Sequence, residues 1–348
     1  MCYAQDTTFS TVYKNYEYVD DITANDSAIF CAGYSFQTKI NDGNACDAYL
    51  LSYDKTNLKL NWSLKVSDAH TNRISSLLYH NNKLYALVTQ GKIVNLNEDV
   101  HLSLFVLNLN GEIEQKIPFG ASFFTPSDMK ITGNILNFAF QVSSSKRYST
   151  SDLSTVVVTY NLATKKTIRK KVTTYYPRPK KILQSKGNLY VMGIYIHPDA
   201  PNLIVSKKGV ISEIRLNAPK TEYFIDSYIK GNKLTIVAVF PGVYGDLNCY
   251  LKYYYINTVT NAITSKIIPY KTMRWDEIRF DTYSLGSSIW LIEKELKTKK
   301  LKYILLGDTG KILKSFPIKD DDGYKQNFIF EDNLLIKASN GRISIIKY

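Results

Sequence analysis

The sequence predicts an all-β fold assembled from repeated four-stranded antiparallel sheets, and three observations lead to this prediction. Apolar runs with period-2 alternation recur along all 348 residues, and Val, Ile, Tyr, Thr and Phe dominate them. Tight turns rich in Gly, Asn and Ser join the runs in pairs, as in β-hairpins. The chain shows no amphipathic helix of convincing length, so repeats of stacked helices are excluded.

One turn residue in each pair of runs serves as an anchor that reveals a repeat. Successive anchors lie 55, 52, 54, 44, 55 and 46 residues apart. A repeat of roughly 40 to 50 residues with strand alternation is typical of propeller blades, because a lone four-stranded sheet cannot bury both of its faces. The sequence therefore predicts a single seven-bladed β-propeller of four-stranded antiparallel blades, with anchors at Ser27, Asn82, Asn134, Asn188, Asn232, Ser287 and Asn333.

Each blade is expected to contain two hairpins, here termed strands a and b and strands c and d. The a–b hairpins are clearest at residues 77–89, 182–195 and 226–240. Six c–d hairpins follow, and their turns are rich in Gly, Asn, Asp and Thr, which favour tight reversals. These c–d hairpins begin at Ala48, Leu102, Thr155, Asn202, Lys252 and Lys302.

The seventh blade lacks a fourth strand at the C-terminus. After the last anchor only one more strand, residues 341–348, remains. The segment Thr8–Val19 has a strand pattern and is predicted to supply the missing outer strand, which would close the ring and leave no unpaired edge between the first and last blades. A loose N-terminal tail is the alternative. We expect one propeller domain over residues 8–348, behind a short tail of residues 1–7.

The first residues suggest an export signal. Cys2 and Ala4 have the small-x-small spacing of a signal-peptidase site, and Gln5 would be the first mature residue. The segment Cys2-Tyr3-Ala4-Gln5 thus resembles the end of a signal peptide, which implies a periplasmic or cell-surface location. A cytoplasmic N-terminus and a lipid-accepting Cys2 are the alternatives. No apolar stretch of about 18 residues is present to span a bilayer.

A resemblance to a known repeat is found in the first blade. The stretch from Tyr53 to Asn57, followed by Trp62, resembles the quinoprotein-type propeller repeat, with Asn57 in place of the usual Gly. The resemblance implies that the turn docks Trp62 against the next blade. Residues 308–310 repeat the Asp-Thr-Gly turn without the Trp. No quinone site is carried over by the resemblance, so we expect no cofactor.

The search for catalytic and metal motifs finds none. The four histidines lie outside any metal or nucleophile motif, and the acidic turns at 41–44 and 320–323 lack the spacing of a calcium loop. We therefore predict neither catalytic residues nor a metal site. Register places Cys31 opposite a residue near Leu51, so a disulfide with Cys46 would need a shifted register, and buried free thiols are expected.

One face of the predicted propeller carries features of a recognition surface. The a–b turns are short, whereas the b–c connections are long and differ from one another, as expected when a rigid scaffold presents variable loops. Aromatic and cationic side chains, which often anchor binding, accompany the d–a connections on the same face. The candidate binding residues are Arg73, Tyr175, Tyr176, Arg178, Arg274 and Trp275. Packing between blades is the alternative role for these side chains.

The positive charge of the chain is unevenly distributed. The net charge is +13, and no acidic residue occurs between Asp152 and Asp199. Basic residues cover strand d of the third blade and strand a of the fourth: Lys165, Lys166, Arg169, Lys170, Lys171, Lys180 and Lys181. A basic outer edge discourages sheet aggregation, and it also attracts acidic partners.

Together these features favour a non-catalytic binding or scaffolding propeller that engages a protein or an anionic glycan through its loop-rich face. Nucleic acid is a minor option because no nucleic-acid motif is present. One alternative is a carbohydrate-active enzyme, a glycosidase or lyase, with a site at the central channel. Its candidate carboxylates are Asp128, Glu222, Asp226, Glu277 and Asp281. A subunit of a larger surface or secretion assembly is the third hypothesis.

Overall fold

The computed structural model describes most of the chain, and all of its regular elements are β-strands. In this described part there is consequently no helix that could cross a membrane. The described residues are 6–10, 17–36, 45–67, 70–94, 97–122, 126–143, 153–172, 178–196, 203–207, 210–218, 222–241, 248–272, 278–285, 288–295, 301–318, 326–331, 334–339 and 342–347.

The described strands form six hydrogen-bonded sheets, one of which consists of two four-stranded halves. A single parallel bridge between Cys46 and Thr71 joins these halves, so the strands make seven antiparallel groups of four, termed sheets 1 to 7. By packing, the chain divides into two compact units. Unit 1 is Met1–Thr173 with Gly323–Tyr348, and unit 2 is Thr174–Asp322.

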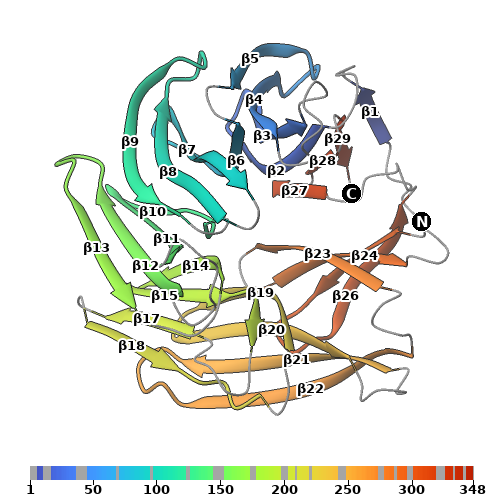
Figure 1. The fold of residues 1–348 in the computed structure, drawn as a ribbon. Coiled ribbons are helices and arrows are strands. Elements are labelled where there is room, and N and C mark those ends of the chain that lie inside the picture. Colours follow the sequence, from blue (N-terminus) through green and yellow to red (C-terminus); the bar gives the residue numbers. More distant parts are fainter. Residues whose placement is uncertain are drawn as a thin grey trace. The chain divides into compact units, whose positions relative to one another are not determined.

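Unit 1 contains four of these groups (Figure 1). Sheet 1 consists of β2 (Glu17–Ala24), β3 (Ala28–Phe36), β4 (Cys46–Asp54) and β5 (Leu60–Val66). Sheet 2 consists of β6 (Thr71–His80), β7 (Lys83–Val94), β8 (Asn97–Leu107) and β9 (Ile113–Ala121). Sheet 3 consists of β10 (Lys130–Thr132), β11 (Ile135–Ser143), β12 (Leu153–Asn161) and β13 (Thr167–Val172). Sheet 7 consists of β27 (Gln326–Glu331), β28 (Leu334–Ser339), β29 (Arg342–Lys347) and β1 (Asp6–Ser10).

Unit 2 contains the other three groups. Sheet 4 consists of β14 (Pro179–Ser185), β15 (Asn188–Gly193), β17 (Leu203–Lys207) and β18 (Val210–Ile214). Sheet 5 consists of β19 (Glu222–Lys230), β20 (Lys233–Pro241), β21 (Asn248–Asn257) and β22 (Ile263–Thr272), with the short β16 (Tyr195–Ile196) added at its edge. Sheet 6 consists of β23 (Ile278–Leu285), β24 (Ser288–Glu295), β25 (Leu301–Leu306) and β26 (Ile312–Ile318).

The N-terminal strand supplies the fourth strand of sheet 7, as the sequence predicted. Strand β1 pairs antiparallel with β29 from Asp6 opposite Ile346 to Ser10 opposite Arg342. The predicted bounds of this strand were wrong at the C-terminal side, because the structure assigns residues 17–19 to β2 of sheet 1. Strand β1 therefore ends at Ser10, and residues 17–19 of the predicted strand belong to sheet 1.

A repeated turn joins strands c and d and explains the anchor positions. In the turns that begin at Asp54, Asn161 and Asn257, the side-chain oxygen accepts hydrogen bonds from the backbone N–H groups two and three residues later. The residue that follows each of them donates its N–H to an a–b turn, at the carbonyls of the anchors Ser27, Asn134 and Asn232. The anchors thus fasten the two hairpins of a sheet to each other.

Apolar side chains pack between neighbouring sheets. One buried cluster combines strands of sheets 1 and 2, for example Phe30 with Phe105, and unit 2 has equivalent clusters between sheets 4 and 5 and between sheets 5 and 6. The indole of Trp62 donates to the carbonyl of Leu109 in sheet 2 at 2.7 Å. A Cβ on Gly111, which has φ +85°, would lie 2.7 Å from the Trp62 ring. Trp62 therefore docks on the next sheet, as the sequence resemblance implied.

A β-bulge recurs in strand a of four sheets, and in sheets 1, 2 and 4 the polar residue after it bonds to the next strand a or to the residue directly before that strand. The bulges lie between Val19 and Asp21, Ile74 and Ser76, Pro179 and Lys181, and Phe224 and Asp226. The N–H of Leu77 donates to the Asp21 carboxylate at 2.7 Å, and the N–H of Met129 donates to the Ser76 hydroxyl at 3.2 Å. In unit 2, Lys181 forms an ion pair with Asp226.

Two of the long b–c connections expected from the sequence, residues 89–101 and 195–202, contain residues that pair as strands. Residues 89–101 were expected to form an irregular loop, but β7 and β8 continue their ladder to Val94 opposite Asn97. After β15, Tyr195 and Ile196 pair with Tyr223 and Glu222 of sheet 5, and residues 197–202 of the expected connection lie outside the described residues. In both places the backbone groups of the paired residues gain hydrogen-bonding partners in a ladder.

Candidate functional site

The candidate site is centred on Arg73, the third residue of β6 in sheet 2. Its guanidinium binds the Asp20 carboxylate through two contacts, Nε to Oδ2 at 2.5 Å and Nη2 to Oδ1 at 2.8 Å. The Asp20 side chain is 2% exposed and that of Arg73 is 32% exposed, so the arginine covers a buried charge and still reaches solvent. Bidentate Arg–carboxylate pairs fix orientation strongly, and this one holds the guanidinium in place.

One aromatic side chain, Tyr34, contacts the guanidinium, and two others pack on Tyr34. The Arg73 Cζ lies 4.6 Å from the centre of the Tyr34 ring, a cation–π distance. The Tyr34 ring stacks on Tyr18 at 5.1 Å, and Phe36 meets each of these rings edge-on at 5.5 Å. Phe36 is 37% exposed. We call Tyr18, Asp20, Tyr34, Phe36 and Arg73 the aromatic–arginine cluster. Burial raises the pKa of Tyr34, so its hydroxyl stays protonated at neutral pH.

The backbone under the cluster is fixed by the bulge and by a glycine. The bulge at Asp20 turns this side chain toward Arg73. Gly33 allows the close approach of β2 to β3, because a Cβ at this position would lie 1.8 Å from the Tyr18 carbonyl oxygen. Tyr34 and Phe36 are two residues apart on β3, so their side chains share one face of the sheet.

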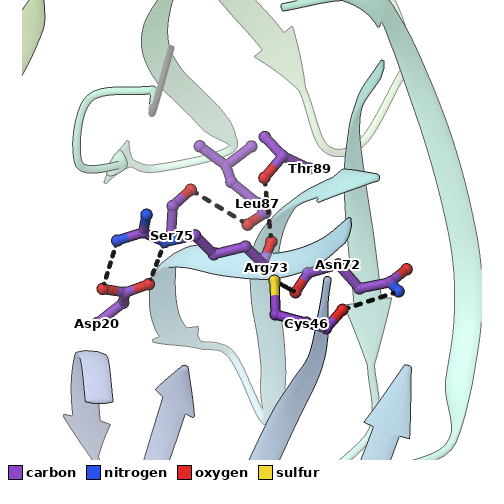
Figure 2. A network of polar contacts seen from close by, with 7 residues as sticks. All are labelled: Asp20, Cys46, Asn72, Arg73, Ser75, Leu87 and Thr89. Carbon is purple, nitrogen blue, oxygen red and sulfur yellow. Dashed lines mark hydrogen bonds and ion pairs between the residues drawn. The ribbon is translucent and has the colours of Figure 1, made fainter. Parts of the chain in front are cut away.

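A network of polar contacts holds β6 beneath the arginine (Figure 2). The Thr89 hydroxyl donates to the Arg73 carbonyl at 3.4 Å. Asn72 and Cys46 exchange contacts, with the Cys46 thiol donating to the Asn72 carbonyl at 3.2 Å and the Asn72 amide donating to the Cys46 carbonyl at 3.3 Å. These bonds connect β6 to both β4 and β7. The cluster consequently rests on paired strands and not on loops.

The carboxyl of Asp21, next to the cluster, is expected to make stability depend on pH. Burial raises the pKa of Asp21 from 3.8 to about 6, although the N–H groups of Leu77 and Ile22 partly oppose this. The folded protein therefore holds a proton on Asp21 that the unfolded chain has lost between these pH values. The free energy of unfolding of the wild type should fall by about 2 kcal/mol relative to Asp21→Asn as pH rises from about 4 to 6.

Denaturant melts of the wild type and of Asp21→Asn over this pH range measure the difference. Above pH 7 the difference should be constant. The raised pKa of Asp21 would be contradicted if the difference in free energy of unfolding between the two proteins did not change from pH 4 to pH 7. A difference that changed in favour of the wild type as pH rises would contradict it as well.

The structure describes only some of the binding residues predicted from the sequence. Arg73 lies on a strand and not in the d–a connection where the sequence reasoning placed it. Arg178 is exposed just before β14, and its carbonyl accepts from the N–H of Ile194 at 3.0 Å. Four candidates lie outside the described residues: Tyr175, Tyr176, Arg274 and Trp275.

The seven basic residues singled out in the sequence fall into two groups, one in each unit. In unit 1, Lys165, Lys166, Arg169, Lys170 and Lys171 lie on β13 and the turn before it, and we call them the basic strip. Strand β13 pairs only with β12, so the strip does follow an outer edge. Arg169 donates to the carbonyls of Phe119 and Pro118 and covers the Phe119 ring at 5.3 Å.

The second group, Lys180 and Lys181, lies on β14 of unit 2, and both side chains contact residues of the neighbouring strand β19. The Lys180 ammonium lies 5.4 Å from the centre of the Phe224 ring, and Lys181 forms its ion pair with Asp226. Both contacts join β14 to β19. These two lysines therefore help to hold β14 against β19.

The carboxylates proposed for a channel site are in part held by lysines. Glu222 is buried, accepts from the Lys252 ammonium at 2.9 Å and from the Tyr254 hydroxyl at 2.5 Å. Asp226 is buried in its pair with Lys181. Glu277 lies outside the described residues, and so do the side-chain surroundings of Asp281. Asp128 is half-buried beside β10. Buried and lysine-paired carboxylates are typical of structural ion pairs.

The two cysteines of sheet 1 lie in the predicted register and do not form a disulfide with each other. Cys31 lies opposite Leu51, and Cys46 lies opposite Phe36. Both thiols are buried and free. Burial strongly raises the pKa of the Cys31 thiol, so this group is not a reactive thiolate.

Sequence reasoning missed the aromatic members of the cluster and the partner of Arg73. Tyr34 and Phe36 alternate at the end of strand b, immediately before a predicted connection, and this spacing could have identified them as a shared face. No pattern in the sequence around Asp20 indicated that it would contact Arg73. Its approach to Arg73, 53 residues away, depends on a bulge that the sequence pattern does not specify.

Comparison with known proteins identifies the fold. No protein-family model and no curated protein matches the sequence. The β-propeller domain of the Trilobed protease from Pyrococcus furiosus is similar, with a TM-score of 0.51 and 10% identity over 96% of this chain and 93% of that chain. The chain has the β-propeller fold. The all-β propeller predicted from the sequence is thereby confirmed.

Two other solved structures give the same level of similarity to this propeller. The N-terminal domain of Nup159 has a TM-score of 0.50 and 10% identity, over 96% of this chain and 90% of that chain. The Pyrococcus horikoshii acylaminoacyl peptidase has a TM-score of 0.51 and 10% identity, over 92% of this chain and 49% of that chain. At these identities the similarity concerns the fold alone. The resemblance to quinoprotein-type repeats stays a prediction.

Proposed function

We propose that this propeller is a non-catalytic binding or scaffolding module that engages a protein partner through the aromatic–arginine cluster. The observation that carries the proposal is the half-exposed Phe36, which packs on two stacked tyrosines beside a fixed arginine. Tyr, Trp and Arg dominate binding hot spots, because they offer large rigid contact area together with a polar group. Side chains already ordered before binding lose little conformational entropy on association.

The location of the cluster agrees with this role. Its residues lie near the start of β2, at the end of β3 and at the start of β6, on the side where the b–c and d–a connections leave the sheets. Loops on that side can add contacts around a rigid centre. In this proposal the seven sheets are the seven blades of a closed ring, and the protein acts after export to the periplasm or cell surface. An anionic glycan on the same face is the alternative ligand.

Capture of partners from the native host with immobilised protein tests this function. Phe36→Ala should reduce capture of a specific partner by about tenfold or more, since hot-spot side chains contribute about 2 kcal/mol. Leu60→Ala is the matched control, because Leu60 is 38% exposed on β5 and Phe36 is 37% exposed. Melting temperatures of both variants must stay near that of the wild type. Equal capture by the wild type and Phe36→Ala would refute the proposal.

A further inference from the structure

A cavity of about 300 Å³ lies between sheets 2 and 3, on strands other than those that carry the aromatic–arginine cluster. It is formed where β7, β8 and β9 of sheet 2 meet the end of β12 and the turn that follows it in sheet 3. All of these elements belong to unit 1. The polar lining residues are Lys83, Tyr85, Glu114, Gln115, Tyr160 and Lys165.

Two tyrosines line the buried part of this cavity. Tyr160 is 1% exposed, its buried hydroxyl makes no direct hydrogen bond with another described residue, and its interaction with the nearby Gln115 side chain partly opposes the effect of burial on its pKa. Tyr85 is 5% exposed. Burial raises the pKa of both hydroxyls, so both are protonated donors at neutral pH. Buried hydroxyls nearly always have a partner, and Tyr160 lines a cavity from which a ligand can supply one.

The rim of the cavity carries an excess of one positive charge. Lys83 and Glu114 form an ion pair, and their side chains are 44% and 39% exposed. The Lys165 ammonium donates to the neutral Gln115 side-chain oxygen at 3.3 Å. Two ammonium groups thus accompany one carboxylate. Lys165 has φ 60° in the repeated c–d turn, which fixes the start of its side chain beside the rim.

The apolar residues of the cavity lining restrict the kind of ligand that can fit. Val106 and Leu162 lie in the wall, beside the two tyrosine rings. A ligand that fits must therefore present an apolar face as well as hydroxyl groups and an anionic group. The volume is at the lower end of ligand sites, near 300 Å³, and therefore suits a single small ring better than a peptide segment.

We propose that this cavity binds a hexuronic acid unit, a pyranose sugar that carries a carboxylate. The Lys165 ammonium would pair with the carboxylate, and Tyr160 and Gln115 would bond to ring hydroxyls. Glu114 accepts from hydroxyls but repels a compact polyanion, so a sugar acid is favoured over phosphate. The C–H face of the pyranose would cover Val106 and Leu162. This site is separate from the protein-binding surface proposed above and does not depend on it.

Titration of the full chain with glucuronate, glucose and inorganic phosphate, followed by calorimetry or ligand-observed NMR, tests the site. Glucuronate should bind saturably and more tightly than glucose. Tyr160→Phe should weaken glucuronate binding by about fivefold, the effect of one lost hydrogen bond. Lys165→Gln should weaken it by about tenfold, as expected for a lost charged contact, and should change glucose binding little.

Two variants in unit 2 provide matched controls. Tyr190→Phe removes another buried hydroxyl without a partner. Lys186→Gln removes an exposed lysine that also has positive φ, 49°, and that also donates to an amide oxygen, here of Asn232. Both controls should bind glucuronate like the wild type. The proposal is overturned if glucuronate shows no saturable binding, if phosphate competes equally well, or if Lys186→Gln weakens binding as much as Lys165→Gln.

Discussion

Deletion of residues 1–10, which removes β1, is expected to lower the melting temperature of this propeller by about 5 to 10 °C. The strand contributes the pairings from Asp6 to Ser10 along β29. Each net hydrogen bond stabilises by about 1 kcal/mol, so the loss is about 3 to 5 kcal/mol. The deletion also leaves β29 as an open sheet edge.

A shorter deletion of residues 1–5 is the control, because it ends before β1 begins. This control should melt near the wild-type temperature. The two transitions are measured by thermal unfolding at one protein concentration, since an open edge also promotes aggregation. If both truncated proteins unfold at the melting temperature of the wild type, β1 does not stabilise sheet 7.

The second large effect is expected at the buried ion pair of sheet 5. Lys252→Met should lower the free energy of unfolding by about 3 kcal/mol, because it leaves Glu222 buried without its cation. The two side chains are 5% and 1% exposed, and the contact is 2.9 Å long. Burial and the nearby Glu222 raise the pKa of Tyr254, so its hydroxyl stays protonated as a donor to the same carboxylate.

A double variant separates the unpaired charge from the loss of packing. Glu222→Gln combined with Lys252→Met keeps an acceptor for Tyr254 and removes both charges, so it should be more stable than Lys252→Met alone. Lys266→Met on the exposed strand β22 is the control for loss of a lysine. Denaturant unfolding of these variants gives the free energies. A change below about 1 kcal/mol in Lys252→Met would contradict the buried-pair interpretation.

Much of the fold could be predicted because local chemistry repeats in this chain. The anchors Ser27, Asn134 and Asn232 were found as turn residues, and the structure shows why they recur, since each accepts the N–H that fastens the second hairpin. Register followed from hairpin geometry, and Cys31 lies opposite Leu51 as expected. These features depend only on residues that are close in sequence.

Features that depend on distant residues were harder to predict. The pairing of β16 with β19 of sheet 5 is an example, because it falls within an expected loop. The candidate site also depends on residues that are far apart in the sequence. Arg73 was selected from its residue type, but its bidentate contact with Asp20 requires a one-residue bulge in β2. A period-2 pattern does not reveal where such a bulge falls.

The cavity residues also escaped sequence reasoning, apart from Lys165. Tyr85 and Tyr160 occur in strands of two different sheets, and each by itself reads as an ordinary core residue. Only the packing of sheet 2 against sheet 3 brings them to one cavity.

Hydroxyl-radical footprinting of the complex with the captured partner tests the proposed binding surface most directly. Oxidation of Phe36 and Tyr34 should slow by about threefold or more when the partner binds, since a buried hot spot excludes solvent. Tyr79, a half-buried aromatic at the a–b turn end that donates to Asn82, should keep its rate. Unchanged oxidation of Phe36 and Tyr34, together with protection of Tyr79, would place the partner at the other end of the strands and contradict the aromatic–arginine cluster as the binding site.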